Sequence, residues 1–347
     1  MAPPMIDALR AALATVIDPD LHKDLVTLNM VRTLHMDGGV ASFDLVLTTG
    51  ACPVKQQLED QCRAAALTVP GVTRVEIRVS AEVPKGPRGE DILPGVGHVI
   101  GVGSGKGGVG KSTVTVNLAC ALAATGARVG LLDADIYGPS IPTMMGINRQ
   151  PAVANKKLIP LERHGVRMIS MGFLLEERQA VVWRGPMLVG ALKQFLTDVD
   201  WGDLDYLLVD LPPGTGDIQL TLAQQTRMTG AVVISTPQAV ALADVRRSVS
   251  MFQKVNIPIL GIVENMAEFV CPACGHVEAI FGHGGAEEEA RLLTLPFLGR
   301  IPLEPSIRRA GDDGTPVAAA EPGSASGRAF RGLAGLVAQQ ASKACLA

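Results

Sequence analysis

The stretch that decides the fold is Gly105-Lys-Gly-Gly-Val-Gly-Lys-Ser112, which matches the pattern G-x-x-x-x-G-K-S/T. An apolar run from His98 to Val102 precedes it, and helical spacing from Lys111 to Thr125, closed by Gly126, follows it. The motif requires this order of strand, loop and helix. Glycines allow positive φ and let backbone N–H groups converge on phosphate oxygens at a helix N-terminus. The stretch therefore predicts a phosphate-binding loop.

Apolar runs continue after this unit. A strand from Arg128 to Leu132 completes a strand–helix–strand unit. Short apolar runs separated by helical patterns indicate a mostly parallel sheet that is buried on both faces. The expected fold class is therefore α/β, a doubly wound P-loop sheet preceded by a small α+β domain. The further predicted strands are Val166 to Met171, Tyr206 to Asp210, Ala231 to Ser235, Ile259 to Val263 and Phe297 to Ile301.

The residues before this sheet have a separate pattern. Prolines and glycines between Glu82 and Asp91 interrupt all periodicity, which is typical of a linker. We expect a first domain at 1–80, a linker at 81–97 and a second domain, which carries the phosphate-binding loop, at 98–347. Within the first domain, helices are predicted at Ile6 to Val16 and Val54 to Leu67, and strands at Leu28 to His35, Val40 to Leu47 and Val72 to Val79.

Composition narrows the possible partners. Hydrophobic residues make up 47% of the 347 residues and charged residues 19%, which is typical of a folded chain. A net charge of -3 gives no overall positive field that would attract nucleic acid or anionic lipid. With 3% aromatic residues, the chain also has few side chains on which the bases of a nucleic acid could stack. The start, Met1 to Arg10, lacks a secretory signal pattern, so we expect a cytoplasmic protein with reduced cysteines and no membrane partner.

The loop and the ends of two strands supply candidates for binding ATP and Mg²⁺. Lys111 would contact the β- and γ-phosphates, Ser112 would place its hydroxyl on Mg²⁺, and Thr113 would reach the α-phosphate. Asp210 ends a predicted strand, where a carboxylate can hold a Mg²⁺ water. The predicted nucleotide-binding residues are Gly105, Lys106, Gly107, Gly108, Val109, Gly110, Lys111, Ser112, Thr113 and Asp210.

Further charged residues are candidates for catalysis. Lys106 would bring a second cation to the γ-phosphate, although a solvated turn lysine is the simpler interpretation. Asp133 and Asp135 follow the second strand and would face the phosphates; of these we favour Asp135 for positioning the attacking water, with turn chemistry as the alternative. The loop from Leu211 to Asp217 would sense the γ-phosphate, unless Asp217 caps the next helix.

Cys271-Pro-Ala-Cys274 is the only C-x-x-C pattern in the chain. Two thiolates do not complete a tetrahedral metal site or a cluster, which takes four cysteines, but a two-fold dimer would supply the missing pair. Zinc is an alternative to an iron–sulfur cluster here, because His276 and His283 lie nearby and four cysteines also suit Zn²⁺.

These motifs carry a family resemblance. The chain also contains Asp133-Ala-Asp-Ile-Tyr-Gly-Pro-Ser140, Trp183-Arg-Gly-Pro-Met187, Asp210-Leu-Pro-Pro-Gly-Thr-Gly-Asp217 and Val263-Glu-Asn-Met266. Together with the loop and the C-x-x-C pair, they resemble the Mrp (ApbC) family of iron–sulfur cluster carriers, whose loop is the deviant Walker A form of ParA and MinD ATPases.

The resemblance implies a homodimer in which Lys106 reaches across to the partner's nucleotide. It implies a labile [4Fe–4S] cluster that Cys271 and Cys274 of both copies bridge, and delivery of this cluster to apo-proteins in a cycle of slow ATP hydrolysis, with cluster scaffold proteins as further partners. By the same resemblance, Asn265 contacts adenine.

The first domain resembles the PaaD-like domain of metal–sulfur cluster assembly factors. The similarity lies in Val16-Ile-Asp-Pro-Asp20, Leu47-Thr-Thr-Gly-Ala-Cys-Pro53 and Pro70-Gly-Val-Thr-Arg-Val75. It implies that Cys52 is a reactive thiol. Because Pro53 follows at an expected helix start, the helix dipole would lower the pKa of this thiol; a buried packing cysteine is the alternative.

The alternative function is that of a partitioning or positioning ATPase whose dimer is held together by zinc. Such proteins bind DNA or membrane through a basic patch or an amphipathic terminal helix. The predicted helix from Gly327 to Leu346 carries only Arg328, Arg331 and Lys343 as basic residues, so we favour a solvated closing helix.

Overall fold

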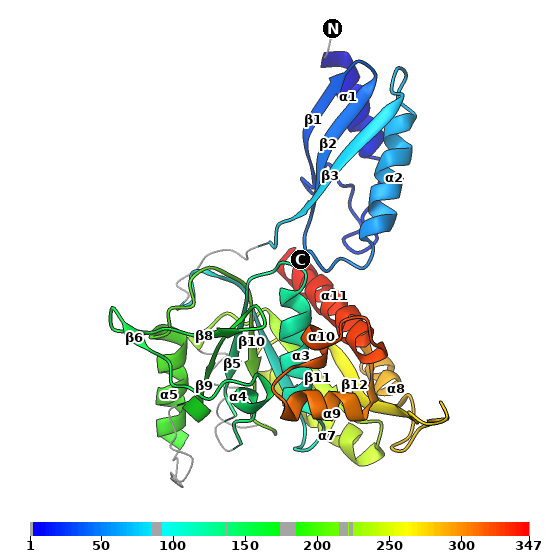
Figure 1. The fold of residues 1–347 in the computed structure, drawn as a ribbon. Coiled ribbons are helices and arrows are strands. Elements are labelled where there is room, and N and C mark those ends of the chain that lie inside the picture. Colours follow the sequence, from blue (N-terminus) through cyan, green and yellow to red (C-terminus); the bar gives the residue numbers. More distant parts are fainter. Residues whose placement is uncertain are drawn as a thin grey trace. The chain divides into compact units, whose positions relative to one another are not determined.

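A computed structural model of the chain describes residues 3–84, 92–135, 138–173, 185–214, 221 and 225–346. The chain divides into two compact units, Met1–Pro84 and Lys85–Cys345, which are described separately (Figure 1). Within the described residues, no helix is both long enough and apolar enough to cross a membrane.

The first unit is a three-stranded sheet with two helices. Strand β2 lies in the middle, antiparallel to β1 and parallel to β3. Every second residue of β2 is buried, so one face of the sheet covers the core that it shares with both helices. The elements are α1 (Pro3–Leu13), β1 (Val31–Asp37), β2 (Val40–Leu47), α2 (Lys55–Leu67) and β3 (Arg74–Ala81).

The second unit is built on one sheet of nine strands within the described residues, in the order β13-β12-β11-β4-β10-β5-β9-β8, with β14 beside β12. All of its pairs are parallel except those of β13 and β8, at the edges of the order. The predicted α/β class is confirmed. The strands are β4 (Val96–Ser104), β5 (Val129–Asp133), β8 (Leu161–Arg163), β9 (Val166–Ser170), β10 (Leu204–Asp210), β11 (Gly230–Ser235), β12 (Ile259–Val270), β13 (Val277–Glu278) and β14 (Phe297–Leu303).

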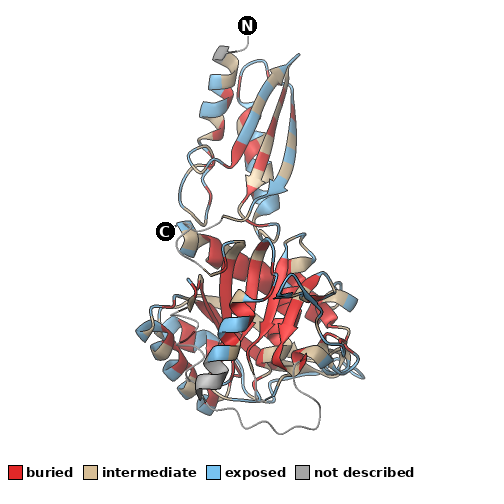
Figure 2. Ribbon diagram, turned by 90° about the vertical axis from the view of Figure 1, so that its left-hand side faces the viewer, coloured by how far each residue is buried: buried red, intermediate tan, exposed pale blue. Residues whose placement is uncertain are grey.

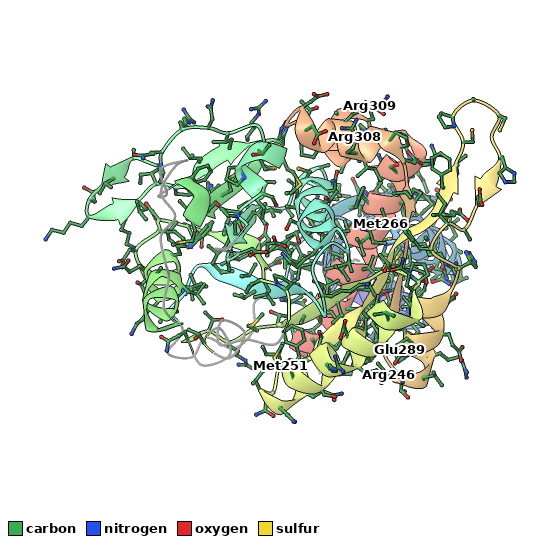
Figure 3. The ribbon with its side chains drawn as sticks, turned by 90° about the horizontal axis from the view of Figure 1, so that it is seen from below. Arg246, Met251, Met266, Glu289, Arg308 and Arg309 are labelled. Carbon is green, nitrogen blue, oxygen red and sulfur yellow. The ribbon has the colours of Figure 1, made fainter. Side chains whose placement is uncertain are left out.

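Helices cover both faces of this sheet, and its strands are buried almost throughout (Figure 2). Helices α5 and α7 share a core with Val99, Leu207 and Val233, whereas α3 contacts the face that carries Asp210. Helix α8 packs on β12 and is joined to α7 by the pair Arg246–Glu289 (Figure 3). The helices are α3 (Lys111–Ala123), α4 (Ile141–Met144), α5 (Gly185–Thr197), α7 (Ala239–Lys254), α8 (Gly285–Leu292), α9 (Pro305–Asp312), α10 (Val317–Ala320) and α11 (Ala325–Leu346); β6 (Val153–Ala154) and β7 (Lys157–Leu158) form a separate pair.

Strand β12 is longer than the sequence pattern predicts. The apolar run ends at Val263, but the strand continues to Val270 because its later residues pair with β14 and β13. Its residues Glu264 and Asn265 are polar yet buried, which explains why the apolar pattern alone places the end of the strand too early.

Candidate nucleotide and thiol sites

The phosphate loop joins β4 to α3 at the carboxyl edge of the parallel sheet. Gly108 and Gly110 have φ values of 79° and 78°, a conformation that glycine adopts without strain, and α3 begins directly afterwards at Lys111. Among the residues that the structure describes, no non-neighbouring atom lies within 4 Å of the position that a Cβ would take at Gly107 or Gly108. The loop therefore offers an open surface of backbone at a helix N-terminus, as a phosphate group requires.

A buried polar cluster lies beneath the loop. The carboxylate of Asp210, which is fully buried, accepts hydrogen bonds from Ser112 Oγ at 2.6 Å and Thr115 Oγ1 at 2.7 Å. The Lys111 ammonium lies 2.8 Å from the same carboxylate. These hydroxyl and carboxylate oxygens are ligands that suit Mg²⁺. The structure thus brings together Lys111, Ser112 and Asp210. It also adds Thr115, which the sequence analysis did not name. Thr115 lies one helical turn after Lys111, and this spacing could have identified it.

The two aspartates after β5 have different surroundings. Asp135 Oδ2 lies 3.7 Å from Lys111 Nζ, beside the phosphate loop. Asp133 is fully buried instead, and it accepts a hydrogen bond from Ser170 Oγ at 2.8 Å. Burial and the neighbouring Asp210 carboxylate raise the pKa of Asp133 to about 8. Asp133 lies beside Asp210 at the carboxyl edge of the sheet, and its predicted orientation towards the phosphates stays a prediction.

Lys106 and Gly105 meet helix α7 in the same chain. Lys106 Nζ lies 3.5 Å from Oε1 of Gln238, the residue that precedes α7. A Cβ on Gly105 would lie 2.4 Å from the Cβ of Asp244, so glycine is required there. The structure places Lys106 at the loop, and its reach towards a second copy stays a prediction.

The remaining predicted nucleotide contacts, Thr113 and Asn265, lie next to the loop. Thr113 Oγ1 donates to the Met144 sulfur at 3.8 Å. Asn265 Nδ2 donates to the Val109 carbonyl at 2.8 Å, and Asn265 is 6% exposed. Asn265 therefore braces the loop from β12, and its predicted contact with adenine stays a prediction.

The C-x-x-C pair occupies the turn of a hairpin formed by β12 and β13. Cys271 N donates to the His276 carbonyl and Gly275 N donates to the Cys271 carbonyl, both at 2.8 Å, and Gly275 has a φ of 71°. Figures 1 and 3 show this hairpin, drawn in gold, projecting from the second unit. Cys274 is exposed and Cys271 is partly exposed. Their geometry presents two neighbouring sulfurs to solvent.

The backbone of the turn favours a thiolate. Hydrogen bonds from the backbone N–H groups of Ala273 and Cys274, and from the Cys274 thiol, lower the pKa of Cys271. Within the part of the chain that the structure describes, no three His, Cys, Asp or Glu side chains are grouped closely enough to hold a metal ion. In that part, one copy offers two sulfurs and not a complete metal site.

Cys52 has surroundings unlike those expected. Burial, together with the nearby carboxylates of Asp18 and Asp20, raises the pKa of the Cys52 thiol, and these effects outweigh the backbone N–H of Val54. The expected lowering by a helix dipole is therefore wrong. Helix α2 begins at Lys55, beyond Val54, and Cys52 packs against the core of the first unit.

Some predicted residues cannot be placed. Trp183, Arg184 and Asp217 lie outside the residues that the structure describes, as do Ile136 and Tyr137. Sequence reasoning also gave no role to Glu264, a fully buried carboxylate beside Asn265.

Comparisons with known proteins identify the family of the chain. A family model described as NUBPL iron-transfer P-loop NTPase matches residues 95–338, and one described as iron–sulfur cluster assembly protein matches residues 6–79. The iron–sulfur cluster carrier protein of Deinococcus radiodurans is 52% identical over 340 residues, 97% of this chain and 96% of its own. That of Synechocystis sp. is 49% identical over 348 residues, with shares of 98% and 99%.

Solved structures share the fold of the second unit. A nucleotide-binding protein from Archaeoglobus fulgidus in complex with ADP is 44% identical, with a TM-score of 0.58, over 65% of this chain and 91% of that chain. The cell division ATPase MinD of Pyrococcus furiosus, 24% identical with a TM-score of 0.53 over 70% of this chain and 98% of its own, shares the fold. The predicted resemblance is confirmed: the chain belongs to the ParA-type family of iron-transfer P-loop NTPases and carries an iron–sulfur cluster assembly domain in front of its NTPase domain.

Proposed function

We propose that the chain binds and hydrolyses ATP and carries a labile [4Fe–4S] cluster, which two copies hold between them and pass to apo-proteins. The observation that carries the proposal is the exposed pair Cys271 and Cys274, on a hairpin whose first strand also braces the phosphate loop. A four-iron cluster takes four cysteine ligands. Two copies related by a two-fold axis supply these four from one pair each.

The phosphate loop and the cluster of polar residues beneath it would perform the ATP chemistry. Lys111 would neutralise the β- and γ-phosphates, and Ser112 and Asp210 would hold Mg²⁺. Asp135 would orient the attacking water, and Lys106 of one copy would stabilise the charge on the phosphates bound by the partner. Thr113 and Asn265 complete the proposed set at the α-phosphate and adenine.

Slow hydrolysis is part of the proposal because one copy alone lacks the second cation. Lys106 Nζ lies 3.5 Å from Gln238 Oε1 of its own chain. We propose that turnover is complete only when a second copy adds Lys106, which would tie hydrolysis to assembly around the cluster. Apo iron–sulfur proteins and cluster scaffold proteins are the proposed partners, and the cytoplasm is the proposed location.

Anaerobic reconstitution with ferrous iron and sulfide tests the proposal. We expect a broad absorption band near ~400 nm and about four iron and four sulfide per two chains, as a cysteine-ligated cluster requires. Cys271→Ala should lose both the band and the iron while still binding ATP. Cys345→Ala, which removes a cysteine from α11, is the matched control and should load normally.

Two results would refute the carrier function. Tightly held zinc without acid-labile sulfide would leave a P-loop ATPase stapled by a structural metal. A full complement of iron and sulfide in Cys271→Ala would place the cluster elsewhere in the chain.

A further inference from the structure

Strand β12 connects the phosphate loop with the thiol pair. Its residue Asn265 donates to the Val109 carbonyl of the loop at 2.8 Å, and Cys271 follows the last residue of the strand. Pairing with β11 ends at Glu264, and the later residues are held by β14 and β13. The same strand therefore touches the nucleotide site at one position and carries the thiol hairpin at its end.

Glu264 stands beside Asn265, at the point where β12 leaves β11. Its carboxylate is fully buried and accepts from Gly284 N at 3.1 Å and from Ala286 N at 2.8 Å. It also accepts from Arg300 Nε at 3.2 Å. A buried carboxylate is stable only with such charge-assisted partners, and three partners from two other elements hold it in one position.

The two backbone donors lie where the chain returns from the hairpin. Gly284, with a φ of 74°, precedes α8, and Ala286 lies in its first turn, so the Glu264 carboxylate caps this helix from another element. Both Cys271 and Cys274 lie between Glu264 and Gly284 in the chain. The carboxylate therefore joins the two ends of the segment that carries the thiols.

Arg300 strengthens this joint from β14. Its guanidinium also pairs with Glu287 of α8 and lies over the Phe297 ring, with its Cζ 5.4 Å from the ring centroid. A single arginine thus holds β12, β14 and α8 together around Glu264.

The next residues of β12 carry the contact with the nucleotide site. Successive side chains of a strand point to opposite faces. Glu264 therefore contacts α8 and Arg300, whereas Asn265 contacts the phosphate loop. Met266 has a φ of 56°, a sparsely populated conformation for a residue with a side chain. Its Cε lies 3.4 Å from the position that a Gly110 Cβ would take. A conformational change of the loop at Val109 or Gly110 would therefore alter its contacts with Asn265 and Met266, two consecutive residues of β12.

We propose that Glu264 is a positioning residue for the thiol pair. It fixes the base of the hairpin to β12, so that nucleotide at the phosphate loop, acting through Asn265 and Met266, alters the accessibility of Cys271 and Cys274. The inference rests on the proposed function only in requiring that nucleotide binds at this loop. A ligand shifts such an equilibrium only through contacts that differ between two arrangements, and in this proposal the hydrogen bond from Asn265 to the Val109 carbonyl is the contact that nucleotide would change.

Alkylation of the metal-free, reduced, full-length chain tests this role without any cluster. Rates of iodoacetamide modification of Cys271 and Cys274 are measured by peptide mass spectrometry, with and without magnesium and a non-hydrolysable ATP analogue, and Cys52 is the internal reference. In the unmodified chain we expect nucleotide to change the two rates by about fivefold, the lower end of usual coupling between sites.

Glu264→Gln keeps the size of the side chain but places an amide against three donors. We expect its ratio of rates with and without nucleotide to fall to about one, while its affinity for the analogue stays within about threefold. Glu268→Gln, the same substitution on a partly exposed residue of the same strand, is the matched control and should behave like the unmodified chain.

The outcomes separate this inference from the proposed function. A nucleotide response in Glu264→Gln equal to that of the unmodified chain overturns the role of Glu264, and nucleotide binding without any change in alkylation overturns the coupling. Failure of iron and sulfide to load refutes the carrier function and leaves this test intact. If Glu264→Gln does not fold, hydrogen exchange in the unmodified chain decides: the amides of Gly284 and Ala286 should change their protection with nucleotide, and unchanged protection overturns the proposal.

Discussion

Three glycines of the phosphate loop form a graded test of its geometry. Gly107 lies outside the left-handed region and has open space at its Cβ position. Gly108 has the same open space but a φ of 79°. Gly110 has a φ of 78°, and its Cβ would lie 2.3 Å from Asn265 Nδ2. Alanine at Gly107 therefore adds neither strain nor a clash. Alanine at Gly108 adds backbone strain, and alanine at Gly110 adds backbone strain together with a steric clash.

The expected losses of stability follow from these contacts. Alanine in the left-handed conformation costs about 1–2 kcal/mol, which is the whole expected effect of Gly108→Ala. Gly110→Ala also displaces the Asn265 amide and breaks its hydrogen bond to Val109, a further loss of roughly 1 kcal/mol. We therefore expect about 2–3 kcal/mol for Gly110→Ala and a change within about 0.5 kcal/mol for Gly107→Ala.

Urea unfolding of the nucleotide-free chain, followed by tryptophan fluorescence, measures these values. Both tryptophans, Trp183 and Trp201, belong to the second unit, so the signal reports on that unit. In a separate titration, Gly107→Ala should weaken ATP binding at least about tenfold, since its methyl group occupies the space proposed for a phosphate. The reasoning is refuted if Gly107→Ala destabilises the chain as much as Gly110→Ala, or if it binds ATP normally.

Three further predictions concern single side chains. Asp210→Asn removes the carboxylate that lies 2.8 Å from the Lys111 ammonium and leaves Asp135, at 3.7 Å, as the remaining counter-charge, so we expect a loss of about 1–3 kcal/mol in urea unfolding and no magnesium-dependent hydrolysis; retained hydrolysis would contradict this role. Lys106→Ala should lower the rate of ATP hydrolysis by about 10³-fold with little change in ATP affinity, and an unchanged rate would show that Lys106 is a solvated turn residue. Burial lowers the pKa of His98 from 6.5 to about 4, so the unfolded chain binds the proton first as pH falls. The free energy of unfolding should therefore fall by about 2 kcal/mol between pH 7 and pH 5 because of His98. In His98→Phe, the fall over the same pH range should be smaller by this amount.

The sequence predicts the sheet of the second unit well where its strands are continuous apolar runs. Strands β4, β5, β10 and β11 lie inside the sheet and are buried on both faces, so their composition alone distinguishes them. The short edge strands β8 and β13 were not predicted, because two or three residues form no pattern and their pairing depends on neighbours distant in the chain.

The candidate site shows the same division. The motif spacing identifies Lys111, Ser112 and Asp210, and the structure brings them together, because a loop and a strand end at one edge of a parallel sheet have to meet there. The pKa of Cys52 was predicted in the wrong direction, since burial against the core of the first unit depends on packing and not on the neighbouring sequence. Glu264 was missed for a similar reason: its partners come from α8 and β14.

Native mass spectrometry of the chain after anaerobic reconstitution tests the central claim most directly, because it counts chains, iron and sulfide on the same particle. The account predicts a particle of two chains with about four iron and four sulfide, which falls to cluster-free chains in Cys271→Ala. A single chain that holds an intact cluster, or a two-chain particle that holds zinc and no sulfide, would contradict it.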